Sequence, residues 1–288
     1  MAEKLETLVS RGLNNSRAKE LLDIHLLVEK GYDAFVLNAA IINTFYTRKT
    51  NLDIDSLKIV YSVLKSERFK ELFENYCKRH QFSKNITFKE CGNSVTKLCD
   101  SIKLNEKINL DQANITLVRH GQDEQNKLGG WSSNKLTDEG VKQVINLTNR
   151  LTKSYDLIVS SDLPRAYETA QIISKHLNLE VVLEPGLRET NNGILKNLTV
   201  SEFNKMYSGL YFSTLKMDQK YPEGESPNDF YNRIKEVFGK IVEKYQNKKV
   251  LIVTHGGVIT VINCLINGWE YSNLLKINIP LASMLTLN

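Results

Sequence analysis

The 288-residue sequence predicts an α/β protein with a mostly parallel sheet and helices on both faces, preceded by a small all-α domain. Two observations support this prediction. From residue 115 onward, short apolar runs alternate with segments of helical spacing, as they do in proteins built from parallel strands and crossover helices. Residues 1–104 instead carry apolar side chains mainly at helical spacing.

The N-terminal part is expected to form helices only. The segment 16–31 has Ser16 as a candidate N-cap, an apolar run from Leu21 to Val28, and Gly31 just beyond its end. Three further segments have helical spacing: Asp33–Arg48, Asp55–His80 and Phe88–Lys103.

The segment from Leu104 to Asn114 is polar and aperiodic, unlike the sequence on either side. A stretch that can bury little apolar surface is typical of a boundary between domains. We therefore place a helical domain at residues 1–104, a linker at 105–114 and a second domain at 115–288.

The second domain alternates strands and helices. The expected strands are Ile115–Arg119, Asp156–Ser160, Val181–Glu184, Val250–Thr254 and Met284–Leu287. The expected helices are Thr137–Thr152, Pro164–Leu177, Thr199–Tyr207, Pro227–Tyr245 and Gly257–Ile266. All-apolar strands such as VLIV at 250–253 are typical of a sheet that is covered on both faces.

Composition narrows the class of protein. Hydrophobic residues make up 41% and charged residues 25%, as in an ordinary globular protein. The net charge of +5 is not gathered in a basic tail, so it does not indicate nucleic-acid binding, and it fits a small anionic ligand equally well. No apolar run approaches the ~20 residues of a membrane span. The four cysteines show no CxxC spacing, and a reduced, cytoplasmic protein is expected.

Cationic side chains stand where the predicted strands end. Arg119 and His120 end or follow the first strand, His255 follows VLIVT, and Arg165 lies in the first turn of a helix behind another strand. In open α/β sheets, ligands bind beyond the carboxyl ends of the strands. Such a group of cations needs a counterion, and the planar fork of arginine matches phosphate oxygens. A small phosphorylated ligand is therefore expected.

Glycines follow both histidines at these strand ends. Gly121 comes directly after the first histidine, and Gly256 and Gly257 come after the second. Glycine permits positive φ and a close approach of the backbone. The pattern therefore predicts that each strand delivers an imidazole to a pocket of phosphate size.

The segment LVRHGQDEQN at 117–126 resembles the signature of the histidine phosphatase superfamily, in the branch related to cofactor-dependent phosphoglycerate mutase. The resemblance continues in order through GGWSSNKLTDEGVKQ, SSDLPRAYETA, LRETNNG, YPEGESPNDFYNRI and VTHGGVI. It covers residues 115–287 and implies the phosphoglycerate mutase-like fold.

The resemblance also implies roles for individual residues. His120 would be the nucleophile that takes the phosphoryl group, which requires a neutral imidazole. Glu189 would protonate the leaving oxygen and then deprotonate the attacking water. The residues implied to bind the phosphoryl group are Arg119, Asn126, Arg165, His255 and Gly256. Neither a metal nor a cofactor is implied, and no cluster of metal ligands stands out in the sequence.

Two departures from the family pattern concern the pocket. Asp123 stands where many members carry serine or threonine, and it brings a negative charge to the phosphate site. After Gly193, the sequence ILKNLT replaces the more usual Trp-Glu-Gly, so the pocket wall near Leu195 and Lys196 is atypical.

The resemblance implies a metal-independent phosphatase that hydrolyses a phosphomonoester through a phosphohistidine. A mutase is less favoured, because the stretch between Glu189 and His255 is compact and holds no Arg-Arg pair for phosphoglycerate. Two alternatives stay open. One is a sensor or regulatory protein that binds a phosphorylated ligand with little turnover, and the other is mutase-type phosphoryl transfer.

A second resemblance concerns residues 16–50. They are similar to the helical C-terminal part of nucleotidyltransferase toxins of the abortive-infection type, with an Arg-x-Lys-Asp-x-x-Asp pattern matched by Arg17, Lys19, Glu20 and Asp23. The Gly-Ser and paired aspartates of the transferase core are absent, so nucleotidyl transfer is not expected. The pattern is equally that of a charged helix face. A protein partner bound through this domain is a further expectation.

Overall fold

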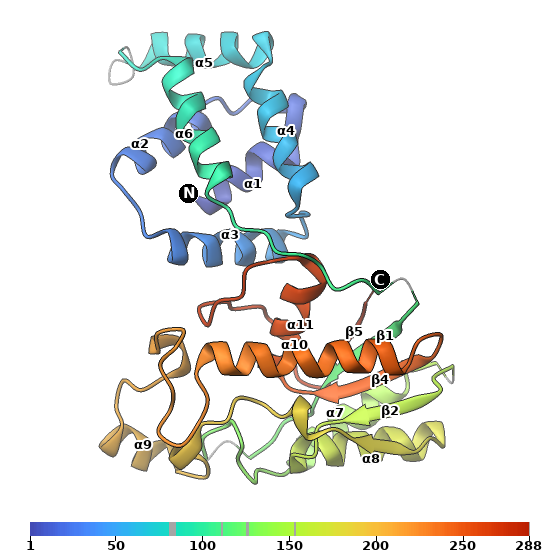
Figure 1. Ribbon diagram of the computed structural model, residues 1–288. Coiled ribbons are helices and arrows are strands. Elements are labelled where there is room, and N and C mark those ends of the chain that lie inside the picture. Colours follow the sequence, from blue (N-terminus) through green and yellow to red (C-terminus); the bar gives the residue numbers. More distant parts are fainter. Residues whose placement is uncertain (81–84, 111, 125–126, 153, 288) are drawn as a thin grey trace. The chain divides into compact units, whose positions relative to one another are not determined.

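A computed structural model describes residues 1–80, 85–110, 112–124, 127–152 and 154–287 (Figure 1). By the contacts between Cα atoms, the chain forms two compact units. The helical unit holds Met1–Glu106 and Asn267–Ile277, and the α/β unit holds Lys107–Ile266 and Asn278–Asn288. The segment Asn267–Ile277 thus belongs to the helical unit. The domain boundaries expected from the sequence, at residues 104 and 115, did not include this return of the chain.

The helical unit is built from short helices. They are α1 (Ala2–Arg11), η1 (Gly12–Asn14), α2 (Lys19–Glu29), α3 (Ala34–Arg48), α4 (Ile54–Leu64), α5 (Glu67–Arg79) and α6 (Phe88–Asp100). Their apolar faces form a core that includes Leu5, Leu21, Ile41, Phe45, Val60, Phe73 and Leu98. Trp269 of the returning segment joins this unit, because its Nε1 donates to the carbonyl of Leu52 at 3.1 Å.

The structure corrects three expectations for this unit. The region was expected to be helical, but no individual helix was assigned to residues 2–11, where α1 lies with Leu5 and Leu8 fully buried. Ser16 is not an N-cap, since α2 begins later, behind Ala18. The single helix expected over 55–80 is broken, because Ser66 accepts a hydrogen bond from the Phe69 amide and so caps a new helix.

The α/β unit contains one five-stranded sheet. Its strands are β1 (Asn114–Arg119), β2 (Leu157–Ser160), β3 (Val181–Leu183), β4 (Lys249–Thr254) and β5 (Met284–Thr286). The order is β3-β2-β4-β1-β5, and only β5 runs antiparallel to its neighbour. The mostly parallel sheet is confirmed, and the strand ends lie within a residue of their expected positions.

Helices cover both faces of this sheet (Figure 1). The helices of this unit are α7 (Asp138–Thr148), α8 (Pro164–Leu177), α9 (Val200–Met206), α10 (Pro227–Lys244) and α11 (Gly256–Asn267), with the 3₁₀ turns η3 (Pro185–Leu187), η4 (Gly193–Leu195) and η5 (Phe212–Thr214). Alternate strand residues such as Val118, Leu251 and Val253 pack with α7 and α8. The other face lies toward α10 and α11 (Figure 1). None of the helices in the described ranges has the length and apolar character needed to cross a membrane.

Candidate active site

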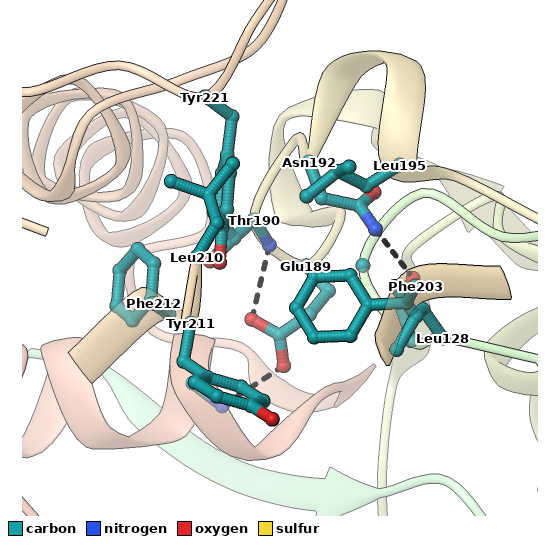
Figure 2. A pocket seen from close by; sticks show the side chains of 13 residues that line it. Leu128, Glu189, Thr190, Asn192, Leu195, Phe203, Leu210, Tyr211, Phe212 and Tyr221 are labelled. Carbon is teal, nitrogen blue, oxygen red and sulfur yellow. Dashed lines mark hydrogen bonds between the residues drawn. The ribbon is translucent and has the colours of Figure 1, made fainter. Parts of the chain in front are cut away.

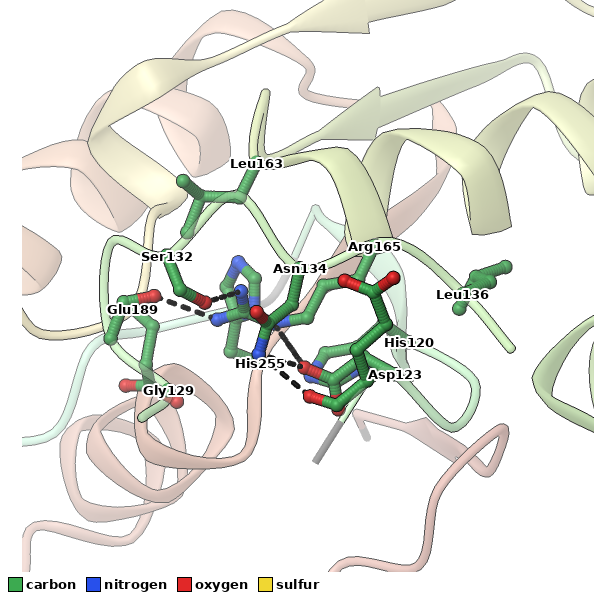
Figure 3. A network of polar contacts seen from close by, with 12 residues as sticks. His120, Asp123, Gly129, Ser132, Asn134, Leu136, Leu163, Arg165, Glu189 and His255 are labelled. Carbon is green, nitrogen blue, oxygen red and sulfur yellow. Dashed lines mark hydrogen bonds and ion pairs between the residues drawn. The ribbon is translucent and has the colours of Figure 1, made fainter. Parts of the chain in front are cut away.

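The parallel strands β1, β2 and β4 end at one edge of the sheet, and His120, Arg165 and His255 lie close together there (Figure 3). Arg119 is the last residue of β1, and His120 follows it. His255 follows β4, and Arg165 lies in the first turn of α8 after the N1 proline Pro164. The rings of His120 and His255 are 5.1 Å apart, and Arg165 Nε donates to His120 Nε2 at 3.3 Å.

His120 is held in one tautomer. Its Nδ1 lies 2.7 Å from the carbonyl oxygen of Gly121, which can only accept, so Nδ1 carries the proton and Nε2 carries the lone pair. Burial, followed by the charge of Arg165, lowers the pKa of His120 to about 3, although the bond to Gly121 acts in the opposite direction. The side chain is therefore a neutral imidazole at pH 7, the form that can attack phosphorus.

Arg165 is a buried cation with few counter-charges. Its guanidinium donates to the Ser132 hydroxyl at 3.2 Å and to the Gly130 carbonyl at 2.9 Å. The nearest carboxylate is Asp123, with Oδ2 3.6 Å from Nε. Burial lowers the pKa of Arg165, and the charges of Asp123 and Glu189 oppose this shift. Neutral acceptors take up most of its hydrogen bonds, so its charge stays available for an anion.

Two further nitrogens are buried without a partner among the described residues: Arg119 Nε and His255 Nδ1. Arg119 does donate through Nη1 to the Ile279 carbonyl, and His255 Nε2 lies 2.9 Å from the Ser161 hydroxyl. Burial is the main cause that lowers the pKa of Arg119 and holds the pKa of His255 well below its ordinary value. Unpaired buried polar atoms are rare in native proteins, and here they mark where an anionic ligand would bind.

Glu189 reaches the same site from the loop behind η3. Its carboxylate accepts backbone N–H groups from Thr190 at 3.1 Å and from Gly257 at 3.0 Å. Its carbonyl accepts the indole N–H of Trp131 at 2.7 Å, so that side chain positions the acid. The Glu189 charge acts on the pKa of both Arg119 and Arg165, which places the carboxylate within electrostatic reach of both guanidinium groups.

The three glycines behind the histidines do not all have the predicted role. None of them has a positive φ, so that part of the prediction is wrong. A Cβ atom at Gly121 would lie 2.6 Å from the Gly140 carbonyl oxygen, and one at Gly257 would lie 2.4 Å from Glu189 Oε1. At Gly256 a Cβ would meet Arg119 at an ordinary 3.4 Å. Close approach therefore requires glycine at two of the three positions.

The departures from the family pattern have different outcomes. Asp123 does bring a carboxylate to the pocket, and its Oδ2 accepts from Asn134 Nδ2 at 3.4 Å. Leu195 is buried in a small apolar cluster, whereas Lys196 is exposed to solvent. Asn126 lies outside the described residues, and its role stays a prediction.

The sequence reasoning missed two serines that orient the cations. Ser132 accepts from Arg165, and Ser161 bonds His255. Both lie within quoted motifs, and Ser161 directly follows β2, which was the signal that could have identified it. Among the residues that the structure describes, no three His, Cys, Asp or Glu side chains are grouped to hold a metal ion.

Comparison with known proteins finds a family match for each part of the chain. Residues 115–288 match the histidine phosphatase superfamily (branch 1). Residues 1–93 match the nucleotidyl transferase AbiEii toxin family of type IV TA systems, as residues 16–50 predicted. The first match covers more than half of the chain, and the second covers about a third.

Individual relatives are similar over the same region. Phosphoglycerate mutase-like protein 4 of Arabidopsis thaliana is 37% identical over 159 residues, which is 52% of this chain and 69% of the relative. A metal-independent phosphoserine phosphatase of the same plant is 33% identical over 165 residues, covering 54% and 69%. The α-ribazole phosphatase structure from Shigella flexneri shares the fold, with a TM-score of 0.55 and 24% identity over 61% of this chain and 90% of that one. Over residues 115–288, the chain belongs to the histidine phosphatase superfamily and is a phosphatase enzyme.

Proposed function

We propose that the protein hydrolyses a phosphomonoester without a metal, through a phosphohistidine formed on Nε2 of His120. The observation that supports this most directly is the hydrogen bond from Nδ1 to Gly121, which leaves the lone pair on Nε2. The low pKa of His120 keeps Nε2 unprotonated at neutral pH, and its lone pair attacks once Arg165 Nε exchanges its bond to Nε2 for a phosphoryl oxygen. The positive charge that phosphoryl transfer requires is supplied by the arginines of the pocket.

The first step transfers the phosphoryl group to the enzyme. The Nε2 lone pair attacks phosphorus while the bond to the leaving oxygen breaks in line with it. Arg119, Arg165 and His255 bind the non-bridging oxygens, and the two arginines offset their charge. A protonated Glu189 gives its proton to the leaving oxygen, which departs as the alcohol.

The second step returns the enzyme to its starting state. The Glu189 carboxylate takes a proton from water, the water oxygen bonds to phosphorus, and the P–N bond to His120 breaks. The products are inorganic phosphate, a neutral imidazole and a protonated Glu189. A mutase would instead return the phosphoryl group to a hydroxyl of the bound organic molecule, so the fate of the phosphoryl group separates the two activities.

The test uses 4-nitrophenyl phosphate with excess EDTA, and compares wild type with His120→Ala. The matched control is His176→Ala, because His176 lies in the last turn of α8, outside the site. Wild type and control are expected to release phosphate at equal rates, and His120→Ala is expected to lose at least about 10³-fold in kcat. Quenched samples of wild type should contain a phosphoenzyme that is stable in alkali and labile in acid.

Three outcomes would contradict the proposal. Activity retained in His120→Ala would place the nucleophile elsewhere, and activity lost in EDTA would require a metal. No turnover and no phosphoenzyme in a folded protein that still binds phosphate would indicate a sensor.

Two further expectations stay proposals. A cytoplasmic location is supported by four cysteines that are all free and buried, as a reducing compartment allows: Cys77, Cys91, Cys99 and Cys264. A protein partner for the helical unit remains a prediction.

A further inference from the structure

A cavity of about 330 Å³ opens beside Glu189 in the α/β unit (Figure 2). This lies within the usual size range of small-molecule sites, roughly 300–1,000 Å³. Its wall is mainly apolar and aromatic. It includes Leu195, which the sequence placed at an atypical pocket wall, together with Phe203, Leu210, Tyr211, Phe212 and Tyr221. Figure 2 shows Phe203 and Tyr211 on either side of the Glu189 carboxylate.

The wall of the cavity is supported by a small apolar core of its own. Leu195, Phe203 and Tyr221 belong to an apolar cluster that is separate from the core under α7 and α8. The rings of Phe203 and Tyr211 meet edge to face at 5.2 Å, and those of Phe212 and Tyr221 stack at 6.4 Å. Tyr211 is 48% exposed, so it forms the rim, whereas Phe203 is only 3% exposed. Such paired rings hold their shape before a ligand binds.

The polar groups in the wall are mostly occupied by the protein itself. The amide of Asn192 donates to the Gly129 carbonyl at 3.2 Å and accepts from the Trp131 amide at 3.1 Å. None of the described lining residues is a lysine or an arginine. A leaving group with a carboxylate would therefore lose hydration here without gaining an ion pair, which is unfavourable.

Three cations near the wall are paired with carboxylates. Arg188 pairs with Asp162, and Arg233 pairs with Glu225 at 2.6 Å. Lys220 pairs with Asp229 at 3.0 Å.

Glu189 connects this cavity to the phosphoryl site. Its carboxylate lines the cavity and also acts electrostatically on Arg119 and Arg165. If Glu189 protonates the leaving oxygen, that oxygen lies at the boundary between the two spaces. The rest of the leaving alcohol then extends into the aromatic cavity.

We propose that the substrate is a phosphomonoester whose alcohol part is uncharged and apolar or aromatic, and that the cavity selects it. This inference rests on the proposed phosphatase function. It predicts that phosphoserine, whose alcohol part carries a carboxylate, is a poor substrate for this protein. The Phe203–Tyr211 pair and Phe212 would bind the apolar group by contact with their rings.

The test compares three primary alkyl phosphates, so that the intrinsic reactivity of the leaving group stays nearly constant. These are 2-phenylethyl phosphate, ethyl phosphate and phosphoserine. We expect kcat/KM for 2-phenylethyl phosphate to exceed that for each of the other two at least about 10-fold, because only its ring fills the cavity.

Two variants probe the wall, with Met206→Ala as the matched control. Met206 is a large apolar residue of α9 that is 54% exposed and does not line the cavity. Tyr211→Ala should lower kcat/KM for 2-phenylethyl phosphate about 10-fold and leave inhibition by inorganic phosphate unchanged. Leu210→Lys should shift the preference toward phosphoserine about 10-fold, since it places a cation in the wall. The control should change neither preference.

A second measurement separates this inference from the phosphatase proposal. Calorimetric binding to His120→Asn should show that 2-phenylethyl phosphate binds more tightly than phosphoserine, whether or not the protein turns over either compound. Equal or reversed affinities would overturn the cavity assignment, as would a Tyr211→Ala variant that keeps the wild-type preference. Loss of turnover for every substrate, with the affinity order as expected, would overturn only the phosphatase proposal.

Discussion

The two units each contain a group of buried or half-buried charges, but the groups differ in their pairing. In the helical unit, Lys4 of α1 bonds Glu20 at 2.9 Å and Asp23 at 2.5 Å, both on α2. In the same unit, Arg48 bonds the buried Glu6 at 2.6 Å. In the α/β unit, by contrast, two buried nitrogens of the candidate site, Arg119 Nε and His255 Nδ1, have no partner among the described residues.

The difference teaches how to tell a structural charge from a functional one. Glu20 and Asp23 belong to the toxin-like pattern, yet their pairing with Lys4 ties α1 to α2, which favours the charged-face interpretation. A buried cation without enough counter-charge is costly, and a fold keeps it where a ligand supplies the missing charge.

The strongest test of this comparison removes one arginine from each unit. Arg119→Ala should lower kcat on 4-nitrophenyl phosphate about 10³-fold, because a buried cation whose Nε has no partner among the described residues is lost from the phosphate site. Arg48→Ala should leave kcat within about 2-fold and lower only the stability of the helical unit. Steady-state rates with unfolding curves measure both. Equal losses of activity would mean that the pairing state does not identify the site.

A smaller effect is expected from the backbone that holds the acid. Gly257→Ala should lower kcat about 10²-fold, because the new Cβ would lie 2.4 Å from Glu189 Oε1 and displace the carboxylate. Gly239→Ala is the matched control, since a Cβ in this α10 position meets nothing within 4 Å. Unchanged kcat in Gly257→Ala would show that the position of Glu189 does not limit the reaction.

The pH dependence of stability should also differ between the units. The folded pKa of His120 is about 3, whereas an unfolded histidine titrates near ~6.5. Between these values the unfolded chain binds a proton that the native state does not. The stability is therefore complete above ~6.5 and falls by about 1.4 kcal/mol per pH unit below it. His255 acts in the same direction.

Glu6 in the helical unit changes the stability in the same direction, but over a lower pH range. Burial raises its pKa, but hydrogen bonds from Thr50 and Arg48 outweigh this, and the net pKa lies below the ordinary value. Its contribution is therefore present above the unfolded pKa near ~4.3 and is lost only as pH falls through the folded pKa.

The measurement uses one tryptophan per unit. Trp269→Phe leaves Trp131 as the reporter of the α/β unit. Urea unfolding of this variant at pH 7 and pH 5 should show the loss, and adding His120→Asn should reduce it. A loss that is the same with and without His120→Asn would exclude His120 as its source.

The smallest effect is expected for the paired cluster. Lys4→Met should destabilise the helical unit by about 1 kcal/mol, because Glu20 and Asp23 lose their shared partner on the half-buried face. Turnover should not change. A change in kcat larger than about 2-fold would give this cluster a role in catalysis that the pairing does not predict.

Much of the site could be predicted from the sequence, because it depends on chain-local signals. A strand that ends in Arg119 and His120, and another that ends before His255, must deliver these side chains to the same edge once the strands are parallel. The N1 proline placed Arg165 in a helix start for the same local reason.

Other features depend on contacts between distant residues. The break between α4 and α5 depends on one hydrogen bond to the Ser66 side chain. The apolar spacing of residues 55–80 does not reveal this bond. The return of Asn267–Ile277 to the helical unit, and the cavity wall that joins Leu195 to Tyr221, bring together segments whose local patterns contain no sign of each other.

The sequence alone thus determined the fold class, the family and the set of candidate site residues, because periodicity and motif order act over short stretches of chain. Only the tertiary structure decided which charges are paired, which tautomer His120 adopts and what lines the space beside Glu189. These properties are set by burial and by partners far apart in the sequence, and burial is a property of the packed chain rather than of any segment.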